Sequence, residues 1–426
     1  MRRSLPCIPL TLILVAVGSW LSCGSASAAD ARWTATGTQV PGQPDKPVWS
    51  FAVSRLHPSI MLAATEGRGV LRSSDAGATW SPTTPTVEAA WVVRFDPRQP
   101  TTAYAGTQAA GLLKSIDEGK TWTSQSVGLT IDVRSIDVLA GTIVVGTSIG
   151  VYDSTDGAAT WHPLGLTGVD VSAVALLAKP SGFTVFAGAD NGNAGAGYLL
   201  QSEDLTGSWR VVKGTVPSDA TVATIAVAAT PSGGAQPPVI AGTSQGMFRS
   251  DDRGVTWNPI NGLPPGDINL VVFNPANPDQ IYAGSDADQG NGGVFRSLDR
   301  GASWSALGAG LPARPRITAL ALQTGEQAVV LAASWNPTTG QAGAYRIPDS
   351  AASVAGTNPS AAPSATSRSS ATPRATAAPL VVTPRSTAAP AYGTYVVAAA
   401  VLAAIGLFVV VRRWRLRRED RRTYAP

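Results

Sequence analysis

The segment Ser73-Ser74-Asp75-Ala76-Gly77-Ala78-Thr79-Trp80 decides the fold, because close copies of it return along the chain. Three further copies keep the pattern Ser-x-Asp-x-Gly-x-Thr/Ser-Trp, and two more keep it except at the glycine position. A small unit copied at a nearly constant period predicts a repeat architecture. The six copies begin, at intervals of 39 to 48 residues, at Ser73, Ser115, Ser154, Ser202, Ser250 and Ser297.

Each residue type of the repeated segment suits a tight turn between two antiparallel strands. The glycine tolerates the positive φ that such a turn requires. The aspartate and the serine hydroxyl can accept hydrogen bonds from backbone N–H groups of the turn. The tryptophan begins the next strand and contributes a large apolar area. We therefore expect a structural, non-catalytic role for the repeat aspartates Asp75, Asp117, Asp156, Asp204, Asp252 and Asp299.

The sequence on the N-terminal side of each copy repeats as well. A glycine-led strand precedes it, as in Gly69–Arg72 and Gly293–Arg296, and a small-residue motif such as Ala105–Thr107 comes one strand earlier. Alternating apolar strands such as Val92–Phe95 come earlier still. Small residues on the inner strands suit the crowding near a central axis. This order predicts an all-β fold, a propeller of seven four-stranded blades formed by residues 30–349.

The seventh unit lacks the repeated segment and the outer strand that follows it. The missing strand is found at the other end of the chain, where Ala31–Thr34 resembles the strand after the repeat, as in Ala78–Ser81. We therefore expect the N-terminal strand to complete the last blade. Such a closure removes the exposed edge of the sheet.

Residues 1–29 are expected to be a signal peptide. Two arginines precede an apolar stretch from Leu10 to Leu21, and Ala26–Ala28 supplies small residues for cleavage. Both cysteines of the chain, Cys7 and Cys23, would leave with it, so the mature protein would contain neither a disulfide nor a cysteine metal site. The alternative is a bacterial lipoprotein signal in which Cys23 is the lipidated residue.

The C-terminal part of the sequence indicates a tether to a membrane. Residues 350–391 are almost entirely Ala, Ser, Thr and Pro and are expected to form a disordered stalk. Residues 392–411 are expected to be a transmembrane helix, since Gly393–Val411 contains 19 uncharged residues and would span about 28 Å. Residues 412–426 contain seven arginines. By the positive-inside rule this tail is cytoplasmic, and the expected location is the cell membrane, single-pass, with the N-terminal ectodomain outside.

The positive net charge of the chain comes from its two ends. Residues 30–391 contain 23 Lys and Arg against 26 Asp and Glu, a net charge of about −3. The ectodomain is therefore not expected to bind nucleic acid. The expected oligomeric state is a monomer.

The turns between second and third strands lie on the face opposite the repeat aspartates, and loops of this kind commonly carry function. Enlarged turns of this kind follow the second strands of the fourth, sixth and seventh blades. The spacing of two aspartates in the sixth-blade turn also admits a calcium site, although an ordinary polar turn explains it as well. The candidates for a ligand-facing rim are Glu66, Arg68, Asp190, Asp286, Asp288 and Trp335.

The repeated segment resembles the Asp-box, or BNR repeat, and this resemblance to Asp-box propellers covers nearly all of residues 30–349. The pattern Gly-Val-Phe-Arg-Ser-x-Asp-x-Gly-x-Thr-Trp is similar to the repeats of photosystem II assembly/stability-factor propellers. That resemblance implies binding of other proteins on one propeller face. We expect a membrane-anchored module that binds or scaffolds a protein or a glycan, with no cofactor, no metal and no catalytic residue.

The alternative function is a glycoside hydrolase of the sialidase-like or xyloglucanase-like type, because sialidases carry the same box. Tyr345–Pro348 matches the letters of a sialidase motif, but it follows the last box instead of preceding the first, so we interpret it as a strand. A two-carboxylate mechanism needs a positioned pair, which only Glu66 with an aspartate of the fourth or sixth blade could supply. Xyloglucan-cleaving relatives use a cleft between two propellers, and one propeller is expected here. The sequence leans against an enzyme without deciding the question.

Overall fold

The structure is a computed structural model. It describes residues 32–36 and 46–350, apart from residues 85–86, 88, 126–130, 191–196, 213–214, 230–235, 265, 287–291, 314, 326–327 and 337. All of them belong to the first of two compact units, Met1–Asn358, and not to the second, Pro359–Pro426. The expected signal peptide, transmembrane helix and basic tail, and all but Ser350 of the expected stalk, lie outside the described residues. Within the described residues, no helix is long and apolar enough to cross a bilayer.

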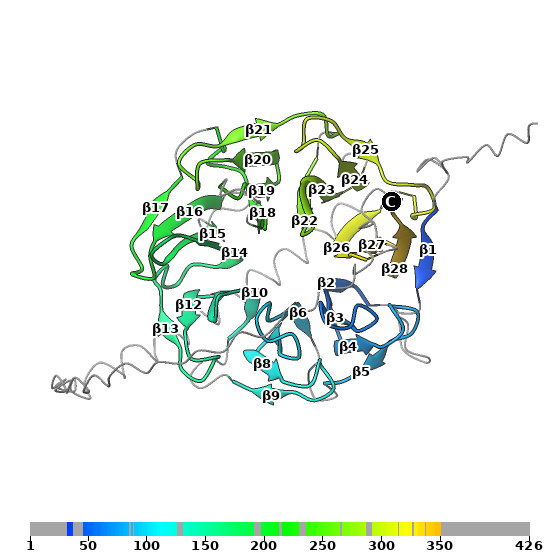
Figure 1. Cartoon of the computed structure of the whole chain (residues 1–426), viewed down its shortest axis with the longest axis horizontal. Coiled ribbons are helices and arrows are strands. Elements are labelled where there is room, and N and C mark those ends of the chain that lie inside the picture. The colour runs from blue at the N-terminus through cyan, green and yellow to red at the C-terminus, as the bar shows by residue number, and fades with distance from the viewer. Residues whose placement is uncertain are drawn as a thin grey trace, which may run out of the picture. The chain divides into compact units, whose positions relative to one another are not determined.

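Seven four-stranded antiparallel sheets stand around a central axis (Figure 1). The first three are β2 (Val48–Val53), β3 (Met61–Thr65), β4 (Gly69–Ser73) and β5 (Ser81–Pro82); β6 (Ala90–Phe95), β7 (Ala103–Thr107), β8 (Leu112–Ser115) and β9 (Thr123–Ser124); and β10 (Val133–Leu139), β11 (Thr142–Thr147), β12 (Gly150–Ser154) and β13 (His162–Pro163). The next three are β14 (Val171–Ala178), β15 (Phe183–Asp190), β16 (Gly197–Glu203) and β17 (Trp209–Val211); β18 (Val222–Val227), β19 (Val239–Thr243), β20 (Gly246–Ser250) and β21 (Asn258–Ile260); and β22 (Ile268–Asn274), β23 (Asn277–Ser285), β24 (Gly293–Ser297) and β25 (Ser305–Ala306). The seventh consists of β26 (Arg316–Gln323), β27 (Val329–Asn336), β28 (Gln341–Pro348) and β1 (Thr34–Thr36). The prediction of an all-β, seven-bladed propeller is confirmed.

The hydrophobic core lies in the seams between blades. The described residues form seven buried apolar clusters, and each draws its side chains from two neighbouring blades. The second strand of most blades is the most completely buried, as in β3 and β7, where every residue is buried; in the sixth blade it is the third strand, β24. Because each blade buries both of its faces against its neighbours, its stability depends on the whole ring.

The last blade is completed by the N-terminal strand. β1 pairs antiparallel with β28, with Thr34 opposite Arg346 (Figure 1). Just before β1, Trp33 is buried in the seam between the sixth and seventh blades. Its backbone N–H donates to the Ala309 carbonyl (2.8 Å) and its indole Nε1–H to the Leu307 carbonyl (2.5 Å). The chain therefore closes the ring both by strand pairing and by a buried side chain.

The turns between third and fourth strands share one hydrogen-bond pattern in five blades. In the first blade Ser73 Oγ donates to Asp75 (2.7 Å) and accepts from the Gly77 N–H (2.9 Å). Asp75 in turn accepts from the Thr79 N–H (2.8 Å) and the Thr79 hydroxyl (2.5 Å). The same four bonds form around Asp117, Asp156, Asp252 and Asp299. We refer to these five loops as the aspartate turns.

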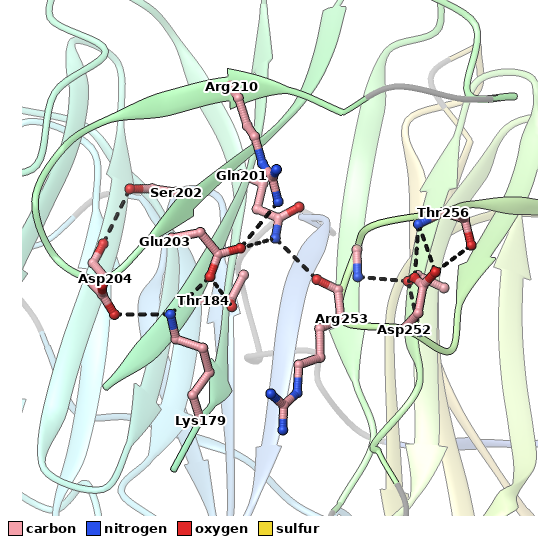
Figure 2. Close-up of polar contacts among 12 residues, drawn as sticks. Lys179, Thr184, Gln201, Ser202, Glu203, Asp204, Arg210, Asp252, Arg253 and Thr256 are labelled. Carbon is pink, nitrogen blue, oxygen red and sulfur yellow. Dashed lines mark hydrogen bonds and ion pairs between the residues drawn. The ribbon is translucent and has the colours of Figure 1, made fainter. Parts of the chain in front are cut away.

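The fourth blade departs from this pattern at Asp204. Asp204 adopts a positive φ of 67°. Its carbonyl accepts from Ser202 Oγ (3.2 Å), and its carboxylate forms an ion pair with Lys179 (3.0 Å). Figure 2 shows this arrangement beside the regular turn of Asp252. The physical reason is the threonine at the glycine position, since the left-handed conformation is taken instead by Asp204 and Gly207. The turn hydrogen bonds expected of the Asp204 carboxylate are thus replaced by an ion pair.

A second set of contacts connects four of the five aspartate turns to the preceding blade. The residue before the turn serine reaches across the seam and donates to a backbone carbonyl of the next turn. That carbonyl belongs in every case to the first of two consecutive residues with positive φ. The bonds are Arg72 Nε to Glu118 O (2.9 Å), Lys114 Nζ to Gly157 O (2.8 Å), Gln201 Nε2 to Arg253 O (3.1 Å) and Arg249 Nη1 to Arg300 O (2.9 Å). In the sixth blade Arg296 instead forms a buried ion pair with Asp349.

The aspartate turns should make the stability depend on acidic pH. Hydrogen bonds from the Thr79 side chain and backbone lower the pKa of Asp75 from 3.8 to about 2. A lowered pKa in the folded state means that this stabilisation is present above pH 3.8 and is lost as the pH falls through about 2. We expect Asp75→Asn to lower the free energy of unfolding by about 1 kcal/mol at pH 7, a modest value because the group is exposed. In urea unfolding, the difference from the parent protein should vanish near pH 2, and a difference independent of pH would contradict this role.

The left-handed positions of the turns allow a second test. Gly119 has a φ of 81°, and a Cβ there would lie 2.4 Å from Leu62 Cδ2. Ala158 occupies the equivalent position at a φ of 75°. We expect Gly119→Ala to lower the free energy of unfolding by about 2–3 kcal/mol, because left-handed strain and overpacking add.

Ala158→Gly is the matched reverse substitution. It should raise the free energy of unfolding by about 0.5 kcal/mol, since relief of left-handed strain exceeds the entropy cost of glycine. The same urea titration measures both variants, and destabilisation by Ala158→Gly would show that the position is not strained.

Candidate functional site

The two faces of the ring carry different loops. Because strands alternate in direction within each blade, the aspartate turns and the turns between first and second strands lie on one face. The turns between second and third strands lie on the opposite face, together with the starts of the innermost strands. We call the first the aspartate face and the second the turn face. The aspartate face carries hydrogen bonds that connect the blades, whereas the turn face carries the starts of the innermost strands.

Every innermost strand contains a β-bulge near its start, at the turn face. A bulge adds one residue to one strand and redirects a side chain. The extra residue is a different type in almost every blade. All blades therefore share the same backbone bulge, but the side chains at the bulge differ around the ring. We call these residues the bulge ring; in blade order they are Trp49, Trp91, Arg134, Ser172, Ala223, Asn269 and Thr318.

Three tryptophans form a continuous group on one side of this ring. The ring centroids of Trp49 and Trp91 are 5.9 Å apart with planes inclined at 52°, and those of Trp49 and Trp335 are 5.9 Å apart at 74°. All three side chains are partly exposed. They come from the first, second and seventh blades, and we call them the tryptophan arc. Partly exposed tryptophan on a loop-bearing face is the residue type most often found at the centre of binding surfaces.

Two members of the arc carry unsatisfied donors. The indole Nε1 atoms of Trp49 and Trp91 are buried and have no hydrogen-bond partner among the described residues. Buried polar groups are nearly always bonded, so two such donors in adjacent side chains call for an explanation. One explanation, which the position of the arc supports, is that a ligand supplies the acceptors after a small movement of the indole rings.

A charged group continues the bulge ring in the third blade. Arg134, partly exposed, forms an ion pair with Asp170 at 2.7 Å and lies 4.0 Å from Asp132. Asp132 also accepts from the backbone N–H of Ala109 (3.1 Å) in the second-blade turn. Two carboxylates and one guanidinium leave this group with a net charge of −1.

Several residues expected to face a ligand instead support the blades. Asp286 is only 5% exposed and forms an ion pair with Arg316, which connects the sixth blade to the seventh. Arg68 is buried and donates from Nη2 to the Lys46 carbonyl (3.3 Å). Both side chains are therefore buried instead of facing a ligand. Each lies at the start of a crowded seam, where a buried charge must be paired. Either residue would contact a ligand only after its ion pair or hydrogen bond opened.

The remaining rim candidates have three different outcomes. Glu66 is partly buried at the β3–β4 turn, where its N–H donates to the Pro47 carbonyl (3.1 Å). Trp335 belongs to the tryptophan arc. Asp190 ends β15 opposite Gly197, with a side chain outside the described part of the structure, and Asp288 lies outside it altogether.

Three residues of the site escaped the sequence reasoning: Trp49, Trp91 and Arg134. A signal for them exists, since each directly follows the first residue of an innermost strand. Aligning the innermost strands of all blades, instead of the turns alone, would have placed two tryptophans at equivalent positions.

The described residues also bear on cofactor and enzyme chemistry. No group of three or more His, Cys, Asp or Glu side chains among them could hold a metal ion. Of the fourth- and sixth-blade aspartates considered as partners of Glu66 in hydrolysis, Asp286 is buried against Arg316, while Asp288 and the Asp190 side chain lie outside the described part of the structure. The turn face also contains a depression of about 660 Å³ in the fifth blade, lined by Ser244–Met247, Ile260–Pro264 and Gly266–Ile268.

The comparisons with known proteins agree with the fold. No protein-family model matches the chain, and no curated protein matches it. YCF48 from Cyanidioschyzon merolae is similar in structure, with a TM-score of 0.52 and 15% identity over 74% of this chain and 98% of that one. A structure of YCF48 bound to D1 peptide gives a TM-score of 0.52 and 15% identity over 74% of this chain and 96% of that one. The GH74 enzyme of Niastella koreensis gives 0.48 and 18% identity over 68% of this chain and 52% of that one. At these identities the likeness shows the fold alone.

The ion pairs of the turn face should differ in their importance for stability. Arg316→Ala removes the cation that pairs with the buried Asp286 carboxylate, and we expect the free energy of unfolding to fall by about 3–5 kcal/mol. Arg134→Ala removes a partly exposed pair and should cost about 1 kcal/mol or less. Urea unfolding of both variants measures the difference. Equal losses would show that Asp286 is not a structural residue.

Proposed function

We propose that this chain is a membrane-anchored, extracytoplasmic β-propeller that binds a protein partner through its turn face and catalyses no reaction. The observation that carries the proposal is the tryptophan arc of Trp49, Trp91 and Trp335, which groups three partly exposed indoles where the innermost strands begin. Large aromatic side chains at the centre of a face supply most of the binding energy of protein interfaces.

A protein partner is supported by the structural comparison. YCF48, which shares the fold, has been seen bound to D1 peptide. The five aspartate turns have the hydrogen bonding that suits an Asp-box, which supports placing the chain among Asp-box propellers. In that arrangement the aspartates hold the blades, and the opposite face receives the ligand.

The membrane anchor follows from the two ends of the sequence. Residues 1–29 have the pattern of a signal peptide, and residues 392–411 have the length and composition of a single transmembrane helix. The proposed stalk, residues 350–391, would hold the propeller away from the bilayer. Such a tether confines the search for a partner to the neighbourhood of the membrane.

The glycoside hydrolase is the less favoured function. Of the fourth- and sixth-blade aspartates that the sequence suggested as partners of Glu66, the one whose side chain is described, Asp286, is buried in an ion pair. Aspartates of the aspartate turns are committed to backbone and hydroxyl donors and have lowered pKa values, so they are poor general acids. We expect the purified chain to hydrolyse none of a panel of fluorogenic glycosides.

Site-specific photo-crosslinking in intact cells tests the binding face. A benzoylphenylalanine at Gln108, exposed on the turn face, should trap a defined protein, whereas one at Val255 on the aspartate face should not. Trp49→Ala in the same full-length chain should reduce the Gln108 crosslink at least tenfold with unchanged protein levels. Crosslinks from Val255 alone, or a Gln108 crosslink unaffected by Trp49→Ala, would contradict the assignment of the face.

A further inference from the structure

We propose that the tryptophan arc binds an extended, proline-containing segment of the partner protein, with a lysine or arginine of that segment beside Arg134. This inference rests on the proposed function, because it names the kind of segment that the same face receives. It is carried by the inclination of the indoles, their unsatisfied donors, the occupied edges of the innermost strands and the charge of the neighbouring blade.

The inclination of the indoles favours a peptide over a sugar. Trp49 and Trp335 pack edge to face at 74°, and Trp49 and Trp91 are tilted at 52°, with centroids 5.9 Å apart in both pairs, so neither pair presents two parallel rings. Sugar rings stack on flat, exposed indole faces, and this packing uses much of those faces. Partly exposed aromatic side chains are also the residues on which polyproline II segments dock.

The unsatisfied donors of the arc match the acceptors of such a segment. Nε1 of Trp49 and Nε1 of Trp91 are buried without a partner in the described structure, and an indole nitrogen can only donate. A polyproline II segment has no internal hydrogen bonds, so its carbonyl oxygens remain available. A small turn of either indole would bring its N–H to one of them.

Strand addition is hindered at the inner edges of several innermost strands. Single backbone groups of β2, β14 and β18 are already bonded by side chains of neighbouring blades. Thr318 Oγ1 donates to the Val48 carbonyl (2.7 Å), and Ser172 Oγ donates to the Val222 carbonyl (2.7 Å). Asp137 accepts from the Leu176 N–H (2.7 Å) in the same manner. The propeller would therefore recognise the segment through its side chains, which suits a segment that forms no strand pairing.

Charge indicates the residue next to the proline-containing part. Arg134, Asp132 and Asp170 together carry −1 in the blade next to Trp91. Residues 30–349 contain 20 Lys and Arg against 26 Asp and Glu, a net charge of −6. A basic side chain is attracted to this acidic surface and can also lie over an indole face.

An array of synthetic decapeptides, probed with the full-length chain in detergent, tests the proposal. One set contains proline with a flanking lysine or arginine, a second replaces each proline by glycine, and a third replaces the basic residue by glutamate. Neutral oligosaccharides are spotted beside them. We expect retention on the first set to exceed that on the second and third at least tenfold.

Matched variants locate the retention on the arc. Trp49→Phe and Trp91→Phe keep an aromatic ring but remove the N–H donor, and each should lower retention at least fivefold. Gln245→Ala changes the same face in the fifth blade and should have no effect. Asp132→Asn keeps an acceptor for the Ala109 N–H and should bring the basic and acidic sets closer together.

Four results would overturn the inference: no peptide retained, equal retention of the proline and glycine sets, retention unchanged in both tryptophan variants, or retention of oligosaccharides instead. If a partner still crosslinks to Gln108 in a Trp49-dependent manner, the proposed function stands and only the kind of segment is wrong. If neither crosslink nor peptide retention occurs, the binding face itself is wrong.

Discussion

The structure depends on one constraint. Each aspartate turn contains two consecutive residues in the left-handed conformation, and the turn must hold the carbonyl of the first of them toward the preceding blade. In each aspartate turn the carboxylate binds a backbone N–H and a hydroxyl, and the serine binds the N–H of the second left-handed residue. The carbonyl of the first left-handed residue is thereby presented to the preceding blade, as with Glu118 and Arg72. Local turn geometry is in this way converted into a contact between blades, beside a seam filled with apolar side chains.

The same constraint separates stability from binding. Hydrogen bonds between blades occupy the aspartate face and the inner strand edges, so substitutions there change the ring as a whole. The bulge ring, by contrast, uses one backbone device in every blade while its side chains are free to differ. Trp49 and Ser172 occupy the same bulge position, yet one belongs to an aromatic group and the other caps the Val222 carbonyl. Some bulge residues, such as Ser172 and Thr318, therefore bond neighbouring blades, whereas Trp49 belongs to the aromatic group.

The sequence was sufficient to predict the fold, because the residues that repeat along it are the types that one particular turn geometry requires. Glycine or alanine at a left-handed position, aspartate two residues earlier and tryptophan three residues later leave little choice of turn. The site was less predictable. Arg68 and Asp286 are polar loop residues by sequence, but the crowding of the seams buries them and pairs Asp286 with Arg316. Trp49 and Trp91 look like core residues of apolar strands, and only the bulge shows that their side chains are redirected.

The fourth blade shows how much of the constraint can be lost without opening the ring. The contact from the third blade to the turn of the fourth blade is missing. Asp153, the residue before the third-blade turn serine, has no proton to donate when ionised, and the fourth blade has no regular aspartate turn whose carbonyl could accept a hydrogen bond. Lys179 replaces this contact within the blade by binding both Glu203 (2.9 Å) and Asp204 (3.0 Å), while Gln201 resumes the contact with the fifth blade (Figure 2). The seam between the third and fourth blades keeps its apolar cluster and the bond from Leu176 to Asp137. Apolar burial thus maintains closure at this seam without a bond to an aspartate turn.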